Sequence, residues 1–361
     1  MRKLAITFAV FALALSPHLS SADSSAAWTW NLPKGFPIPP VPANNPMTEA
    51  KVELGRFLFY DTRMSANGKQ SCATCHQQNL AFTDGRAVAI GTTGESHSRS
   101  AMSLVNVAYG GALTWSNPQL KKLEDQALVP MYGDHPVELG LREGDGFLAT
   151  LRRDSKYQAL FERAFPQDAD RVTTANVTKA LACFERTIIS ARSPYDRYHY
   201  DRDDSAISES AKRGEVLFFN QHLSCFRCHG GFNFSDASVT ERNAGRTIEF
   251  HNTGLYNVYP RPNVGIYEHT KSRADLGKFK TPTLRNIAVT APYMHDGSVP
   301  TLDAVLDHYS SGGRGHDNPN KDPLIGGFTL SVQDRADLIA FLTSLTDDAL
   351  IHDPRFGSPW P

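Results

Sequence analysis

Two short segments carry the residue types that could bind a haem covalently. Residues 72–76 (CATCH) and 225–229 (CFRCH) both have the pattern C-x-x-C-H. This spacing lets two thiols add to the two vinyl groups of one haem, while the adjacent histidine supplies an axial nitrogen to the iron. A redox C-x-x-C pair or half of a zinc site needs no histidine at that offset, and neither explains the duplication. The sequence therefore predicts two covalently bound c-type haems, attached through Cys72, Cys75, Cys225 and Cys228 and ligated by His76 and His229.

The N-terminus has the features of a secretory signal peptide. Arg2 and Lys3 precede the apolar run Leu4–Leu15, and the small residues of segment 20–22 follow it. About 12 apolar residues are too few to span a bilayer, so we expect residues 1–22 to be cleaved rather than to form an anchor. No other segment is long and apolar enough to cross a membrane. The protein is therefore predicted to be exported to the periplasm, which suits c-type haem attachment because that reaction takes place outside the cytoplasm.

Composition and charge exclude some classes of partner. The chain has 361 residues, with 37 Lys and Arg against 38 Asp and Glu, so its net charge is −1. There is no basic patch of the kind that binds nucleic acid. The fifth cysteine, Cys183, lies in the amphipathic segment Val177–Ile188 and is expected to be a buried structural thiol.

Helical patterns with long loops between them predict a mainly α fold. The proline-rich segment Trp28–Pro46 cannot be a helix, so residues 23–47 should form an extended arm. A helical pattern precedes each haem motif, which is an internal repeat and predicts two cytochrome-c-like haem domains. The predicted domains are residues 48–200 and 201–361, with the boundary in the polar run Arg197–Ser208. The helical patterns span residues 48–61, 145–165, 174–189, 210–221, 301–309 and 331–345.

Three longer motifs resemble one family of bacterial enzymes. The segments ELGRFLFYDTRMSANGKQSCATCH, GEVLFFNQHLSCFRCHGG and TPTLRNIAVTAPYMHDGSVPTLDAV are similar to those of the di-haem cytochrome c peroxidase and MauG superfamily. The resemblance runs from about Pro46 to Leu345. The segments NLPKGFPIPPVPANNPM and AFTDGRAVAIGTTGESHSRS look most like a subgroup of MauG-like enzymes that includes the di-haem protein of methanobactin operons. The resemblance implies that the N-terminal haem reacts with peroxide and that the C-terminal haem handles electrons.

The resemblance also implies that the first haem is open to peroxide. Peroxidases of the family place a histidine ligand soon after an Ile-Gly pair, but Ile90-Gly91 is followed here by Thr92. Nearby His97 is interpreted as a surface or structural histidine. The first haem is therefore expected to be five-coordinate at rest.

Residues of the family's peroxide pocket and of its electron relay are also present. Gln126, Pro130 and Glu138 match in order a Gln, a Pro and a Glu that follow a Trp, here Trp115. A carboxylate in a mostly apolar pocket could take a proton from peroxide and return one to the leaving oxygen, with the amide orienting the substrate. Trp115 would carry an oxidising equivalent between the haems. The alternatives, a surface role for Glu138 and a purely structural role for Trp115, remain open.

The sixth ligand of the second haem distinguishes MauG-like enzymes from peroxidases. In the peroxidases a Met lies fourteen residues after the histidine of the PYxHDG motif, and here that position is Tyr309. A thioether raises the haem potential, whereas an anionic phenolate stabilises oxidised iron. MauG-like enzymes have Tyr at this position, so the resemblance implies Tyr309 as the sixth ligand. His308 is the rival ligand, and only one of two adjacent helical residues can face the iron.

Two other family positions are less complete. Thr290 and Pro292 match residues whose oxygens hold a calcium ion, but Ser100 replaces the family's Asn, so calcium and its absence both stay open. MauG also has a surface Trp two residues before the second haem motif, and Leu223 stands there. The exit route for oxidising equivalents should therefore differ.

The function implied by the resemblance is a MauG-like, peroxide-dependent oxidation. Hydrogen peroxide would generate a bis-Fe(IV) state that oxidises residues of an exported partner protein. The methanobactin-operon relatives suggest a copper-related partner whose tryptophan becomes a kynurenine-type product. The alternatives are a cytochrome c peroxidase fed by a small cytochrome and a plain electron carrier.

Overall fold

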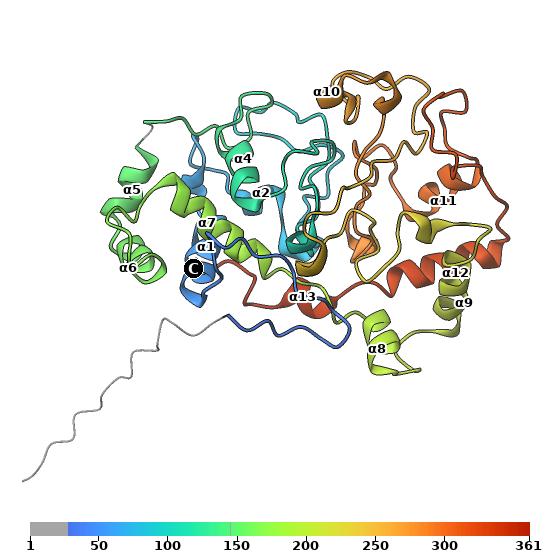
Figure 1. The fold of residues 1–361 in the computed structure, drawn as a ribbon, viewed down its shortest axis with the longest axis horizontal. Helices are drawn as coiled ribbons and strands as arrows, with labels where there is room; N and C mark the ends of the chain where they lie inside the picture. Colours follow the sequence, from blue (N-terminus) through green and yellow to red (C-terminus); the bar gives the residue numbers. More distant parts are fainter. Residues whose placement is uncertain (1–27, 145) are drawn as a thin grey trace, which may run out of the picture.

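The computed structural model describes residues 28–144 and 146–361, and these form an elongated molecule with two helical lobes (Figure 1). The predicted signal peptide lies outside these residues. The described helices are α1 (Glu49–Phe59), α2 (Cys72–Cys75), α3 (Leu123–Gln126), α4 (Leu128–Tyr132), α5 (Phe147–Arg153), α6 (Ser155–Ala164), α7 (Thr174–Arg186), α8 (Pro194–Asp201), α9 (Glu209–Phe218), α10 (Tyr267–Thr270), α11 (Leu302–Ser310), α12 (Val332–Thr343) and α13 (Asp348–His352).

The prediction of a mainly α fold with extensive loops is confirmed. Over the described residues, strand pairing is limited to isolated bridges such as Gln77–Thr83 and Tyr293–Val299. None of the described helices is both long and apolar enough to cross a membrane.

Each lobe is built on one pair of crossing helices. In the first lobe α1 packs against α7, and in the second α9 packs against α12. A glycine lies at each crossing, because a Cβ at Gly55 would collide with the Ala180 carbonyl and a Cβ at Gly214 with the Asp337 carbonyl. The repeat seen in the sequence thus extends to the way the helices approach each other.

The two helix pairs form separate hydrophobic cores. The first core includes Leu54 and Leu58 of α1 together with Leu181 of α7. The second contains Phe218 of α9 and Phe341 of α12. Serine or threonine side chains cap the N-termini of these helices by accepting backbone N–H bonds, so the polar ends are satisfied where the apolar faces are buried.

Two segments cross the domain boundary predicted from the sequence. The predicted boundary at residues 200–201 falls inside α8, and Tyr195 of that helix belongs to the second core. In the other direction, Leu350 and Ile351 of α13 pack into the first core, and the Arg56 side chain donates to the Gly357 carbonyl at 2.8 Å. The C-terminus therefore returns to the first lobe (Figure 1).

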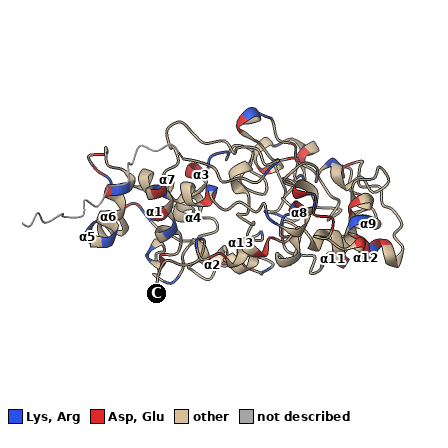
Figure 2. Cartoon of the chain, turned by 90° about the horizontal axis from the view of Figure 1, so that it is seen from below, with Lys and Arg blue, Asp and Glu red and all other residues tan. Residues whose placement is uncertain are grey.

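Two further sequence expectations can be compared with the structure. The described part of the arm, from Trp28 to Pro46, contains no helix, as predicted. The single helical pattern of residues 145–165 is instead two helices, α5 and α6. Asp154 separates them because its extended backbone ends α5 and its side chain caps α6 by accepting from the Lys156 amide. Basic and acidic residues are interspersed over both lobes (Figure 2).

Candidate active site

The first C-x-x-C-H segment forms the short helix α2 and the turn after it. The Ser71 amide donates to the Thr74 hydroxyl at 3.0 Å, which fixes the start of the helix. His76 Nδ1 lies 2.9 Å from the Phe82 carbonyl oxygen. A carbonyl can only accept, so Nδ1 carries the proton and Nε2 is left with a free lone pair. The first histidine is therefore oriented as an axial ligand.

The second segment repeats this arrangement. Cys225–Arg227 form a 3₁₀ turn, and His229 Nδ1 lies 3.0 Å from the Phe234 carbonyl oxygen. Phe82 and Phe234, whose carbonyls accept these bonds, both have the left-handed backbone conformation. Such a shared departure from the usual backbone indicates that the local geometry is needed to aim the histidine.

These residues fit two covalently attached haems. All five cysteines are free of disulfides, so the thiols of both motifs remain available for thioether bonds. Burial lowers the pKa of His76 and of His229, which favours the neutral imidazole that binds iron. Each motif opens into its own cavity. The empty volume, counted together with the open mouth of the cavity, is about 770 Å³ at the first motif and about 2250 Å³ at the second. Cys183 is fully buried in α7, as expected of a structural thiol.

The first cavity gathers three of the residues predicted for peroxide chemistry. Gln126, Pro130 and Glu138 line it together with Cys72 and His76. Gln126 ends α3, Pro130 lies in α4, and Glu138 lies in the loop that follows α4. The structure thus brings an amide and a carboxyl to the cavity that contains the first histidine ligand.

The loop of residues 90–92 holds Glu138 in place. The Thr92 amide donates to the Glu138 carbonyl at 2.8 Å, and a Cβ at Gly91 would collide with the Val137 carbonyl. The Ile-Gly pair that precedes a ligand in peroxidases serves here to pack against the Glu138 segment. Burial raises the pKa of Glu138 to about 7, so its carboxyl can both accept and donate a proton near neutral pH.

Two further titratable residues line the same cavity. His97, interpreted from the sequence as surface or structural, has its Nε2 3.8 Å from Glu138 Oε1, while its Nδ1 accepts from the Arg99 amide. Glu185 of α7 has a buried Oε2 without a hydrogen-bond partner among the described residues, and burial raises its pKa to about 8. Glu185 was not predicted from the sequence. A glutamate on an otherwise apolar face of helix 174–186 was the available signal.

The second cavity contains Tyr309. Tyr309 lines it together with Cys225, Cys228 and His229, whereas His308 does not. His308 Nε2 instead lies 3.0 Å from the Thr253 carbonyl, and burial lowers the pKa of His308 to about 4. The geometry therefore favours Tyr309 over His308 as the residue that faces the second iron.

The environment of Tyr309 requires a cation if the phenolate is to form. Within the described part of the chain, its hydroxyl has no hydrogen-bond partner, and burial raises its pKa well above the usual value. Ferric iron would supply the positive charge that offsets this cost. The site thus suits a ligand to oxidised iron and gives little reason for a free tyrosinate.

Trp115 lies apart from the other predicted catalytic residues. It lines the second cavity and not the first. Its indole Nε1 donates to the Ser100 carbonyl at 3.0 Å, and its ring contacts His295 edge-on with centroids 6.5 Å apart. Ser100 also lines the second cavity, so this bond anchors Trp115 at that cavity.

The structure places the three candidate calcium-site residues in the same cavity as Trp115. Ser100, Thr290 and Pro292 all line the second cavity. The Ser100 hydroxyl donates to the Met294 carbonyl at 3.2 Å and its carbonyl accepts from Trp115, so both oxygens already have partners. No carboxylate is among the three residues, whereas protein calcium sites generally include one.

Within the described residues, one group of side chains has the spacing of a metal site, namely Cys228, Asp236 and His251. Cys228 is one of the two thiols for the second haem. His251 is bonded through both ring nitrogens, to Asp236 at 2.8 Å and to Asp322 at 2.7 Å. This group is therefore better explained as an ion-paired histidine than as a metal site.

Comparison with known proteins agrees with this geometry. A family model described as di-haem cytochrome c peroxidase matches residues 49–205, and one described as RoxA-like, cytochrome c-like, matches residues 278–311. The methylamine utilization protein MauG of Methylophilus methylotrophus is 36% identical, covering 91% of this chain and 93% of that protein. The chain belongs to the di-haem cytochrome c peroxidase and MauG family. It is thus a haem-dependent oxidoreductase with two c-type haems, as predicted.

The chain is similar both to cytochrome c peroxidases and to MauG-like proteins, the two branches of the family. Cytochrome-c peroxidase IdrP1 of Denitromonas iodatirespirans is 34% identical, with 92% of each chain covered. The crystal structure of a MauG-like protein associated with microbial copper homeostasis is 44% identical and has a TM-score of 0.90, covering 93% of this chain and all of that one. Family membership therefore gives the cofactors and the general chemistry but does not separate the two branches.

Proposed function

We propose that the protein is a periplasmic, MauG-like enzyme that uses hydrogen peroxide to oxidise residues of a partner protein. The observation that carries this proposal is the position of Tyr309 in the cavity of the second histidine ligand. A phenolate ligand stabilises oxidised iron and lowers its potential, whereas the thioether of an electron-accepting peroxidase raises it. The second haem would then store oxidising equivalents rather than collect electrons from a small cytochrome.

When bound, the two haems supply peroxide cleavage and storage of its two oxidising equivalents. Glu138 takes a proton from hydrogen peroxide and returns one to the leaving hydroxyl, because its pKa of about 7 suits both steps. Gln126 orients the substrate through its amide. Pro130, on the same wall, contributes an apolar surface without a backbone N–H donor. Trp115 is the proposed relay between the two sites.

The proposed partner protein is inferred from the proteins that this chain resembles. The similar structure associated with microbial copper homeostasis suggests a copper-related partner protein. The resemblance to the methanobactin-operon relatives suggests that this partner is exported and that one of its tryptophans is converted to a kynurenine-type product. The signal-like segment 1–22 supports export to the periplasm. A calcium ion at Thr290 and Pro292 is part of the proposal only as an auxiliary site, since Ser100 replaces the family's Asn.

The proposal is tested with the mature holoprotein and the exported proteins encoded beside it. Peroxide should produce a mass change at an aromatic residue of one such partner, detected by peptide mass spectrometry. Turnover with reduced small cytochrome c should be slow by comparison. Tyr309→Met should still consume peroxide but lose partner oxidation, whereas His308→Ala should retain it.

The opposite pattern would identify the enzyme as a cytochrome c peroxidase. Rapid steady-state oxidation of reduced cytochrome c, with no modified partner, contradicts the MauG-like proposal. A protein that neither consumes peroxide nor changes its spectrum on peroxide addition would be a plain electron carrier.

A further inference from the structure

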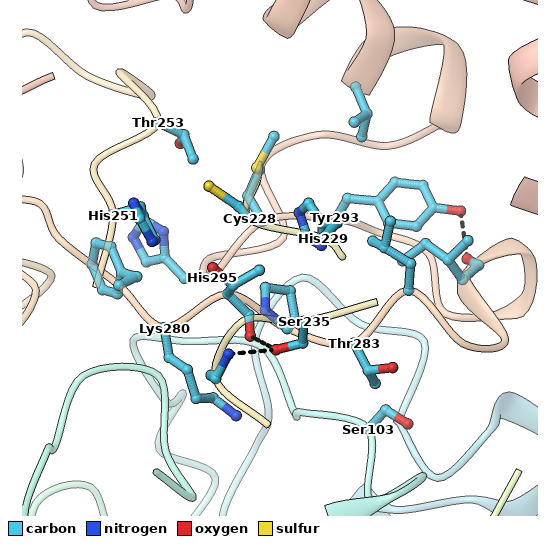
Figure 3. Close-up of a pocket in the computed structure, with 18 of the residues that line it drawn as sticks. Ser103, Cys228, His229, Ser235, His251, Thr253, Lys280, Thr283, Tyr293 and His295 are labelled. Carbon is cyan, nitrogen blue, oxygen red and sulfur yellow. Dashed lines mark hydrogen bonds between the residues drawn. The ribbon is translucent and has the colours of Figure 1, made fainter. Parts of the chain in front are cut away.

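Lys280 is a cation in the wall of the second cavity and has no counter-charge among the described residues. It follows Phe279 in an extended segment, and its backbone amide donates to the Trp115 carbonyl at 2.9 Å. Among the described residues, no hydrogen bond or ion pair reaches its Nζ. Burial lowers the pKa of Lys280 to about 8, with no nearby carboxylate to offset the shift. Figure 3 shows its side chain among those that line the cavity.

The cations that are buried among the described residues are paired. Lys51 donates from Nζ to the Pro46 carbonyl at 2.8 Å and to Asn45 Oδ1 at 3.2 Å. The guanidinium of Arg285 forms two hydrogen bonds to Asp196 at 2.8 and 2.9 Å. Lys280 is half-buried at the cavity wall, and a cation that has lost much of its hydration without gaining a counter-charge is costly. The contrast indicates that the partner of Lys280 comes from a group bound in the cavity.

A second polar group in the same wall also lacks a partner. Nε2 of His295 is buried and unbonded within the described structure. The ring of His295 stacks on Phe279, with centroids 3.7 Å apart, and contacts Trp115 edge-on. Lys280 and His295 are therefore held by the same neighbours, and both line the cavity of the second haem motif.

We propose that Lys280 binds a propionate of the haem attached at Cys225 and Cys228, with His295 Nε2–H as an auxiliary donor. This haem brings two carboxylates into the cavity, and a buried carboxylate needs cationic or N–H partners. The motif and Tyr309 line the same space as Lys280, so the haem that they hold accounts for the unpaired cation. Lys280 is thus a positioning residue that also sets the charge near the second iron.

The inference depends on haem occupancy and not on the identity of the partner protein. A positive charge near the haem favours the reduced iron, because reduction adds an electron. Replacing Lys280 by a neutral residue should therefore lower the potential of the second haem. The first haem, in its own cavity, should be affected much less.

The test is a spectroelectrochemical titration of the holoprotein for the wild type and three variants. Lys280→Met should keep two haems by pyridine haemochrome assay. At a fixed applied potential its ferric-to-ferrous ratio at the second haem should rise by roughly tenfold, the scale for one charge at low effective dielectric. Lys280→Arg keeps the charge, so the potential of its second haem should stay close to that of the wild type. Lys278→Met removes a lysine outside the cavity, paired with Asp275 at 3.1 Å, and should change nothing.

Two results would overturn the inference. One is an unchanged potential of the second haem in Lys280→Met with both haems bound, and the other is a shift confined to the first haem. If Lys280→Met does not fold, the test is made on Lys280→Arg. The frequency of its propionate-bending mode is measured by resonance Raman spectroscopy and compared with that of the wild type. A moved mode of the second haem supports the contact, and a mode identical to wild type contradicts it.

Discussion

The two lobes share a scaffold but differ in what faces their cavities. Each has a glycine-mediated helix crossing, a C-x-x-C-H turn and a histidine whose Nδ1 donates to a phenylalanine carbonyl. The first cavity presents Glu138 and Gln126, and the second presents Tyr309. A carboxyl with a pKa of about 7 suits proton transfer, whereas a tyrosine in a site that opposes free phenolate suits metal ligation. One repeated framework thus provides two different iron environments through its loops and α11.

The largest expected effect is loss of one haem from one lobe. Cys225→Ser combined with Cys228→Ser removes both thioether bonds of the second site. Pyridine haemochrome assay should fall from two haems per chain to one. Cys72→Ser with Cys75→Ser is the matched change in the first lobe and should also leave one haem. A wild-type value near one haem would remove the basis of the comparison.

Glu138→Gln should affect only the first lobe. Loss of the proton-transferring carboxyl should slow the reaction with peroxide by roughly 10²-fold, the usual scale for a general acid–base group. Both haems should remain, and the spectrum of the second should not change. Stopped-flow spectroscopy measures the rate. Glu185→Gln is the companion variant for the other carboxyl of this cavity, and an unaltered rate in Glu138→Gln would assign Glu138 a structural role.

The haem sites were predictable because their residues are contiguous or lie at fixed offsets. The cysteines and histidines of the two motifs could be located from the sequence pattern alone. Tyr309 could be located because the resemblance to the family supplies the offset of fourteen residues after His295. His97 and Glu185 could not be assigned in this way. They reach the first cavity because the loop of residues 89–97 folds back on itself and because the end of α7 passes the cavity, which are properties of the tertiary fold.

A long-range contact beside the predicted boundary was also beyond local patterns. Asp196, just before the polar run that begins at Arg197, forms a buried ion pair with Arg285. This contact joins residues 89 positions apart in the sequence. The break between α5 and α6 depended on a single cap at Asp154, which periodicity alone does not reveal.

The helix crossings predict a matched loss of stability in the two lobes. Gly55→Ala and Gly214→Ala each place a methyl group against a backbone carbonyl that cannot rotate away. Each should destabilise the protein by about 1–3 kcal/mol, the range for overpacking a core. Thermal unfolding of the holoproteins measures this. Gly326→Ala, where a Cβ meets no atom within 4 Å and the backbone is not left-handed, controls for the general effect of replacing a glycine.

The smallest expected effect is a pH dependence confined to the first lobe. Glu138 must be ionised to accept a proton, and its pKa of about 7 lies above the usual value because the site is buried. The ionised fraction, and with it the peroxide rate, should rise roughly tenfold from pH 6 to pH 8. Glu138→Gln should abolish this inflection. A rate that falls over the same range would mean that the neutral acid is the reactive form.

The most direct test of the central claim is low-temperature EPR of the resting ferric holoprotein with Tyr309→Phe as the probe. The wild type should show one high-spin haem, open at the first site, and one low-spin haem, ligated by His229 and Tyr309. Tyr309→Phe deletes only the hydroxyl and should convert the low-spin signal to high-spin, whereas His308→Ala should retain it. Two low-spin signals in the wild type, or loss of the low-spin signal in His308→Ala but not in Tyr309→Phe, would contradict the proposed difference between the two lobes.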